Sequence, residues 1–307
     1  MSFSFDVKQE ICNRDVTKPC CKKAFAYGLA LFGKSFSVMN MGIQTENEWI
    51  ANLYAEILAS VCGVYVDIKT KGRRKNAPGH NYMATVPDSE QRTRVLSCFG
   101  HSGDEVQLRI NRAILSDDCC FASFIRGVFL ACGSVADPQR EYHLELVTPH
   151  LKLQSDLQAL LTELGLNAKR ILRKNSYVLY YKESENIEDF LTLCGASKFS
   201  MELMNVKIYK DIRNKVNRIT NCETANISKT VDASTQQIDS INALKNAGYL
   251  EELSPELLEI AQLRLTNPDM SLRELGQALT IPLSRSGVNH RLKRIMEITQ
   301  EKLQGKA

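Results

Sequence analysis

The chain has 307 residues, of which 44% are apolar and 24% charged, which is typical of a globular protein that buries a full core. No apolar run approaches the roughly 20 residues that a membrane helix needs, and residues 1–10 hold three charged side chains and no apolar signal core. We therefore expect a cytoplasmic protein without a membrane segment. The formal net charge of +4 is too small to identify a partner, so the distribution of charge matters more.

Ten cysteines raise the question of disulfides or a metal site. The chain contains no C-x-x-C pair, but two pairs are adjacent in sequence, Cys20-Cys21 and Cys119-Cys120. Neighbouring side chains rarely converge on one tetrahedral metal ion. We therefore expect free thiols, no metal site and no cofactor.

An approximate internal repeat covers about residues 20–100 and 118–204. Each copy begins with a short apolar helix that carries small residues along one face, and the two copies align on Gly28 and Gly127. A hairpin, an amphipathic helix that ends at a glycine, a second hairpin and a closing helix follow in both copies. The expected ranges, in that order, are 24–35, 36–45, 47–62, 64–86 and 90–99, and then 123–134, 135–148, 151–164, 166–181 (turning at 175–176) and 187–193.

The second hairpin of each copy carries basic residues without an intervening acid. These residues are Lys71, Arg73, Arg74 and Lys75 in the first copy, and Arg170, Arg173 and Lys174 in the second. Such side chains suit contact with DNA phosphates. Basic turns are also common for reasons of solubility, and this half of the chain also suits docking of a protein, so these alternatives stay open.

Residues 205–221 are polar and basic and are expected to form a helical linker after a first domain at 1–204. No strand signal is visible in 222–307, where helices are expected at about 223–247, 255–265, 271–279 and 284–304. Pro255 follows Ser254, which places proline at a first helical position. Ser271 and Glu274 have the spacing of a capping box.

Residues 271–304 have the pattern of a helix-turn-helix, in which the second helix enters the major groove. Its predicted inward positions are Val288, Leu292 and Ile295. For base reading we expect Arg285, Ser286, Asn289 and His290, and for phosphate contact Ser284, Arg291, Lys293 and Arg294. The alternatives are a solvated basic face on a bundle helix and, for His290 alone, a solvated or capping histidine.

Several long, ordered blocks of this sequence resemble the WhiA family of bacterial sporulation and cell-division regulators. They are FIRGVFLACGSV (124–135), YHLE (142–145), NR (217–218), NCETAN (221–226), KTV (229–231), SLRELG (271–276) and SRSGVNHRL (284–292). The resemblance implies an α+β first domain, a pseudo-two-fold LAGLIDADG homing-endonuclease-like fold built from the two repeats. The resemblance also implies that an all-α helix-turn-helix domain follows the first domain in the chain and is similar to the promoter-reading region of sigma factors.

LAGLIDADG nucleases bind a divalent metal ion with one carboxylate from the end of each repeat helix. In the alignment on the two glycines these acids would fall at Gly33 and Cys132, neither of which can hold magnesium. Asp137 follows a few residues later in a predicted turn and has no counterpart in the first copy. The sequence therefore predicts no catalytic residues and no enzyme.

We interpret the chain as a sequence-specific DNA-binding regulator of transcription, nucleoid-associated, involved in cell division, chromosome segregation or sporulation. The alternative is a non-catalytic scaffold of the division machinery or nucleoid with weak, nonspecific DNA binding. Double-stranded DNA is the expected partner. The resemblance also implies work with a small iron–sulfur regulator or with RNA polymerase.

Overall fold

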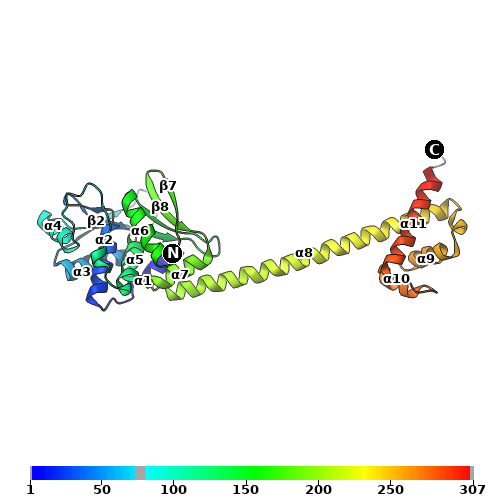
Figure 1. Ribbon diagram of the computed structural model, residues 1–307, viewed down its shortest axis with the longest axis horizontal. Helices are drawn as coiled ribbons and strands as arrows, with labels where there is room; N and C mark the ends of the chain where they lie inside the picture. Colours follow the sequence, from blue (N-terminus) through cyan, green and yellow to red (C-terminus); the bar gives the residue numbers. More distant parts are fainter. Residues whose placement is uncertain (1, 73–79, 305–307) are drawn as a thin grey trace. The chain divides into compact units, whose positions relative to one another are not determined.

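The computed structural model describes residues 2–72 and 80–304 (Figure 1). The chain divides into two compact units, Met1–Lys210 and Asp211–Ala307. Three of the basic residues predicted to contact DNA, Arg73, Arg74 and Lys75, lie outside the described residues.

The first unit consists of two copies of one α+β arrangement, as the internal repeat predicts. Its elements are α1 (Phe3–Cys12), then α2 (Pro19–Leu31), β1 (Ser35–Phe36), β2 (Met41–Thr45), α3 (Glu48–Cys62), β3 (Asp67–Gly72), β4 (His80–Thr85) and α4 (Ser89–Cys98), then the short helix η1 (Arg112–Ile114), and then α5 (Asp118–Cys132), β5 (Gly133–Val135), β6 (Leu144–Thr148), α6 (Leu151–Glu163), β7 (Lys169–Arg173), β8 (Ser176–Tyr181) and α7 (Ser184–Leu193). The sheets run in the equivalent orders β1-β2-β4-β3 and β5-β6-β8-β7, with antiparallel neighbours throughout.

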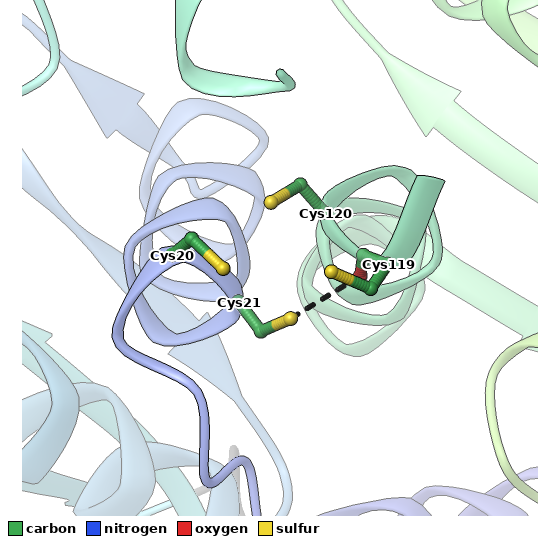
Figure 2. Close-up of side chains that lie close together, drawn as sticks. All are labelled: Cys20, Cys21, Cys119 and Cys120. Carbon is green, nitrogen blue, oxygen red and sulfur yellow. Dashed lines mark hydrogen bonds between the residues drawn. The ribbon is translucent and has the colours of Figure 1, made fainter. Parts of the chain in front are cut away.

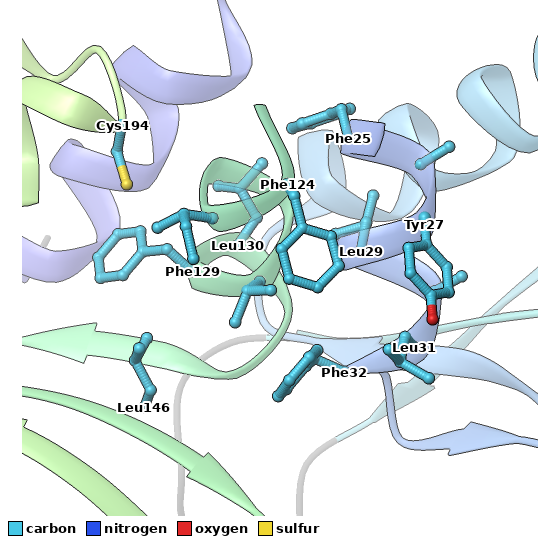
Figure 3. Packing of buried hydrophobic residues seen from close by; sticks show 14 of the residues in the cluster. Phe25, Tyr27, Leu29, Leu31, Phe32, Phe124, Phe129, Leu130, Leu146 and Cys194 are labelled. Atoms are coloured by element: carbon cyan, nitrogen blue, oxygen red, sulfur yellow. The ribbon is translucent and has the colours of Figure 1, made fainter. Parts of the chain in front are cut away.

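The two copies meet at the crossing of α2 and α5. A Cβ added at Gly28 would overlap the backbone carbonyl of Phe124, and one added at Gly127 would overlap that of Phe25, so only glycine permits this approach. Aromatic side chains pack beside the crossing: Phe124 lies 5.5 Å from Tyr27 and 6.1 Å from Phe32 between ring centroids (Figure 3). The aligned glycines of the sequence are therefore the contact points of the fold.

The helix α1 has no counterpart in the predicted elements. It is short and buries only two side chains, Val7 and Ile11, so its sequence carries little amphipathic signal. The buried Arg126 of α5 holds it, donating hydrogen bonds to the carbonyl oxygens of Ile11 (2.6 Å) and Arg14.

The turn between β7 and β8 also differs by one residue from the prediction. The positive φ angles fall at Lys174 (47°) and Asn175 (63°), as a two-residue hairpin turn requires.

The adjacent cysteine pairs do converge, and the expectation that they would not is wrong. Cys20 and Cys21 lie in the first turn of α2, and Cys119 and Cys120 lie in the first turn of α5. Their four sulfur atoms all lie within 4.8 Å of one another, in the space between the two helices (Figure 2). The side chains of two neighbouring residues on one helix point in different directions. Here, however, α2 and α5 each direct a pair of cysteine side chains into the space between them.

The second unit is helical. The expected linker and the helix after it are one continuous helix, α8 (Ser197–Asn246), because no glycine or proline interrupts the sequence between Gly195 and Gly248. After it come η2 (Leu250–Glu252), α9 (Pro255–Thr266), α10 (Leu272–Ala278) and α11 (Arg285–Gln304). These helices share a core whose buried members are Ile241, Leu244, Leu250, Leu253, Ile260, Ala261, Leu275, Leu279, Val288, Leu292 and Ile295.

Candidate nucleic-acid interface

The helices α10 and α11 form the predicted helix-turn-helix. Val288, Leu292 and Ile295 are buried in the core of the second unit, as their spacing of four and three residues predicts. The turn between the helices is tight: the Leu283 N–H donates to the Gly276 carbonyl (2.9 Å), and a Cβ at Gly276 would overlap the Leu283 carbonyl. Core and turn together fix which face of α11 points to solvent.

Both helices of the motif are capped by serine. The Ser271 side chain accepts from the Glu274 N–H (3.3 Å), and the Glu274 carboxylate accepts from the Ser271 N–H (2.8 Å), which completes the capping box. Ser284 accepts from the Gly287 N–H (3.2 Å) at the start of α11. The turn is also anchored to α9, because the Glu259 carboxylate accepts from the Thr280 N–H (2.7 Å).

Substitution of Ser271 by alanine is expected to lower the free energy of unfolding by about 1 kcal/mol, since an N-cap serine satisfies an otherwise unpaired N–H. Amide hydrogen exchange in α10 measures this loss locally. Faster exchange in α10 with unchanged exchange in α3 is the expected pattern. Unchanged exchange in α10 would contradict the capping role.

The same box predicts a dependence on pH. The hydrogen bond from the Ser271 N–H holds the pKa of Glu274 below its ordinary value of 4.5. The carboxylate therefore stabilises the fold above pH 4.5, and this contribution is lost as the pH falls through the lower, folded-state pKa. Glu274→Gln keeps an acceptor at this position but cannot titrate, so exchange in α10 should vary less with acid than in the parent chain.

The outward face of α11 carries most of the predicted contact residues. Arg285, Ser286, His290 and Lys293 are exposed, and Asn289 is half-buried. Ser286, His290 and Lys293 follow one another by four and three residues, so they form one stripe opposite the buried positions. Arg285 and Asn289 form a second stripe beside it. We call these five residues the α11 face.

Arg285 and Asn289 also line a pocket between α8, α10 and α11, within the second unit. Lys229 of α8 and Arg273 of α10 line the same pocket, and sequence reasoning did not assign either of them to the interface. Both belong to blocks that carry the family resemblance. The basic surface therefore extends beyond α11 onto its neighbouring helices.

Two predicted phosphate ligands are engaged within the protein. The Arg291 guanidinium lies 2.7 Å from the Glu256 carboxylate of α9 and is largely covered, while Arg294 pairs with Glu297 (3.0 Å) and Glu301 (3.7 Å) on its own helix. Exposed pairs of this kind contribute little to stability and are exchanged readily. Arg294 can therefore turn toward a phosphate more easily than Arg291, which is held against α9.

A further arginine of the second unit, Arg264, has a structural position. Its side chain is buried, and it donates to the carbonyl oxygens of Met270 (2.7 Å) and Pro268 (3.3 Å) just before α10. Burial holds the pKa of Arg264 below its ordinary value. Arg264 thus fixes the loop that leads into the helix-turn-helix.

The basic hairpin of the second repeat does not form one surface. Arg170 pairs in register with the buried Leu179, whereas Arg173 pairs with Ser176 three residues further along β7, so the two arginines point to opposite faces of the strand. Arg173 also lies 2.9 Å from the Glu145 carboxylate. Lys174 occupies the exposed turn. Lys71 lies in β3, opposite Asn81.

Gly33 and Cys132 occupy the positions that align with the metal-binding acids of LAGLIDADG nucleases. Both line a pocket in the first unit in which, among the described lining residues, Glu46 is the one carboxylate. Lys8 of α1 also lines it, and its ammonium group donates to the Leu130 carbonyl (3.4 Å). Burial raises the pKa of the Cys132 thiol to about 12 and lowers that of Lys8. Asp137 lies in the loop after β5, where its carboxylate caps the Gln139 N–H (2.8 Å).

Among the described residues no helix is both long and apolar enough to span a membrane.

The family models for the WhiA LAGLIDADG-like domain and the WhiA C-terminal HTH domain match residues 121–213 and 216–299. A crystal structure of full-length WhiA from Thermatoga maritima shares the fold, with a TM-score of 0.60 at 23% identity over 98% of this chain and 99% of that one.

Curated relatives match along the whole chain. A protein of Ruminiclostridium cellulolyticum is 39% identical over 98% of this chain and 97% of its own length, and one of Clostridium botulinum is 39% identical over 99% and 100%. Both are named probable cell division protein WhiA. This chain therefore belongs to the WhiA family, with a LAGLIDADG-like domain followed by a helix-turn-helix domain.

Proposed function

We propose that this protein is a sequence-specific regulator of transcription that acts in cell division, chromosome segregation or sporulation. The observation that carries the proposal is the α11 face, whose side chains are exposed except for the half-buried Asn289, while a buried core holds the other side of the helix. No acidic residue occurs between Glu274 and Glu297, so nothing on the turn or the first half of α11 repels DNA.

Each residue of the α11 face has a chemical role in this proposal. Arg285 suits the O6 and N7 atoms of guanine, and Asn289 suits the N6 and N7 atoms of adenine. Ser286 and His290 would lie beside them at the floor of the major groove. Lys293 and Arg294 would contact phosphates further along. The backbone N–H groups behind Ser284 offer another phosphate site. Arg291 would join them only after leaving Glu256, and Lys229 and Arg273 extend the phosphate contact.

We further propose that the LAGLIDADG-like domain does not cleave DNA. Phosphodiester hydrolysis in this fold needs a pair of carboxylates on a divalent ion, and here a glycine and a neutral thiol occupy those positions with a lysine nearby. Its remaining role is binding. Lys174 lies in the exposed turn and would contact a phosphate beside the strands, whereas Arg173 would do so only after leaving Glu145. Arg170 would contact a different surface. Lys71 belongs to β3 and stays a proposed phosphate contact.

A magnesium-dependent cleavage assay on supercoiled genomic plasmid libraries tests the absence of nuclease activity. We expect no nicking by the full chain, and Cys132→Ala should behave identically, because the Cys132 thiol does not hold magnesium. Nicking that requires magnesium and disappears in Cys132→Ala would mean that the domain is an active nuclease.

A scaffold role is the second candidate, and one feature of α8 favours it. Within the second unit Ile212, Val216, Ile219, Ile227 and Val231 are half or more exposed, at spacings that place them along one side of the helix. RNA polymerase, a small iron–sulfur regulator or a division protein could dock on such a side. In this case the α11 face would be dispensable in the cell while Ile219→Asp would abolish function.

Capture of sheared genomic DNA by the purified full chain, followed by sequencing, distinguishes the two candidates. A regulator located on the nucleoid should enrich one short motif near promoters. Capture without any motif would favour the scaffold with nonspecific binding, and no capture would contradict DNA binding altogether.

A further inference from the structure

We propose that Cys20, Cys21, Cys119 and Cys120 form a binding site for one thiophilic metal ion, with zinc as the expected ion. All four thiols are free, and all four side chains point into the gap between the first turns of α2 and α5 (Figure 2). Tetrahedral zinc has Zn–S bonds of about 2.3 Å, which corresponds to sulfur atoms about 3.8 Å apart. The sulfur atoms here all lie within 4.8 Å of one another, so small side-chain rotations would complete the site.

The site follows the internal symmetry of the domain. The shift in numbering that carries Gly28 to Gly127 also carries Cys20 to Cys119 and Cys21 to Cys120. Each repeat therefore contributes the same two ligands from the same turn of the same helix. The site lies at the N-terminal ends of α2 and α5, opposite the ends that lead to Gly33 and Cys132.

The surroundings suit a thiolate centre. Four thiolates around a divalent ion carry two net negative charges. They lie beside the first turns of α2 and α5, where the N-terminal end of each helix is equivalent to about half a positive charge. Cys21 and Cys120 are buried while Cys20 is exposed, which leaves a path for the ion to enter. On binding, the four thiol protons leave to solvent.

Outer contacts hold the ligands in place. The Ser123 hydroxyl donates to the Cys119 carbonyl (2.9 Å), and the Cys120 N–H donates to the Asp117 carbonyl (2.8 Å). The Cys21 thiol donates to the Cys119 carbonyl (3.5 Å), a contact that joins the two helices and that a metal ion would replace. A bound ion would thus staple one repeat to the other, and removing it should weaken the domain.

The test uses the full chain, purified under reduction without chelator, and elemental analysis of the protein. We expect one zinc per chain, or one iron in the same place, and binding of cobalt to the metal-free chain with the visible spectrum of a tetrahedral tetrathiolate. Cys20→Ser/Cys119→Ser replaces the two more accessible ligands and should lower bound metal by more than about tenfold, since even loss of an outer-shell partner costs roughly 10- to 100-fold in affinity. Cys222→Ser, at an exposed thiol of α8, is the matched control and should bind as the parent does.

Thermal unfolding gives a second readout. A chelator should lower the unfolding midpoint of the parent chain and of Cys222→Ser, but not that of the double variant. Three results would overturn the proposal: no metal in the purified chain together with no tetrathiolate cobalt spectrum, equal metal content in the parent and the double variant, or mass spectra showing Cys20 or Cys21 in a disulfide with Cys119 or Cys120 under the same reducing conditions. If the double variant fails to fold, the single variant Cys20→Ser replaces it in the same measurements, because Cys20 is the most exposed of the four cysteines.

Discussion

Replacing Gly127 by valine is expected to prevent the first unit from folding. Any side chain here would overlap the backbone of Phe25 and approach that of Leu29 on the facing helix, so no rotation of a neighbouring side chain makes room for it. Ordinary overpacking of a core costs about 1–3 kcal/mol because side chains adjust. Here two helices must separate, and the buried aromatic contacts beside the crossing would be lost with them.

Far-ultraviolet circular dichroism and the yield of monodisperse protein measure the effect of Gly127→Val. Gly165→Ala is the matched control: it lies in the same repeat at φ 80°, with open space around the missing Cβ, and should cost only about 1 kcal/mol of backbone strain. If Gly127→Val melted no earlier than Gly165→Ala, the close crossing of α2 and α5 would be wrong.

Alanine at Arg285 or Asn289 is expected to weaken binding to the preferred DNA site by about 1–3 kcal/mol each and to relax the preference for the base concerned. Both are bidentate partners of base edges in the proposed role, so their loss affects one base pair more than the others. Alanine at Lys293 should weaken all DNA sequences about equally and reduce the salt dependence, because a phosphate contact carries no sequence information.

Titration of the preferred site and of single-base variants at several salt concentrations separates these outcomes. Thermal unfolding should be nearly unchanged in the Arg285 and Lys293 variants, because both side chains are exposed. It should change little in the Asn289 variant, because this half-buried side chain is not part of the buried core. Equal losses on every sequence from all three variants would mean that the roles of base reading and phosphate contact are assigned wrongly.

Periodic patterns predict most of this fold. The repeat, its order of elements and the inward positions Val288, Leu292 and Ile295 follow from hydrophobic spacing, and the capping box follows from two residues. Other features depend on contacts between distant segments. The packing of helices against one another sets the pairing of Arg291 with Glu256 and the convergence of Cys20 with Cys119. The spacing of residues along a single helix does not predict such contacts.

Some of the differences were nevertheless encoded in the sequence. Side chains alternate between the two faces of a strand, so Arg170 and Arg173 lie on opposite faces. Their shared charge nevertheless suggested a single basic cluster. The cysteine pairs and the aligned glycines have the same offset, which places the two pairs at equivalent positions of the two repeats. The continuity of α8 follows from its lack of glycine and proline.

Methylation interference on the captured DNA site shows whether α11 contacts base edges in the major groove as proposed. Methylation of guanine N7 blocks a major-groove contact. If Arg285 contacts guanine, methylating one guanine in each recognised site should prevent binding of the parent chain but no longer affect Arg285→Ala, while interference at other positions persists. An unchanged interference pattern in Arg285→Ala, or interference from minor-groove adenine positions alone, would contradict the proposed contact.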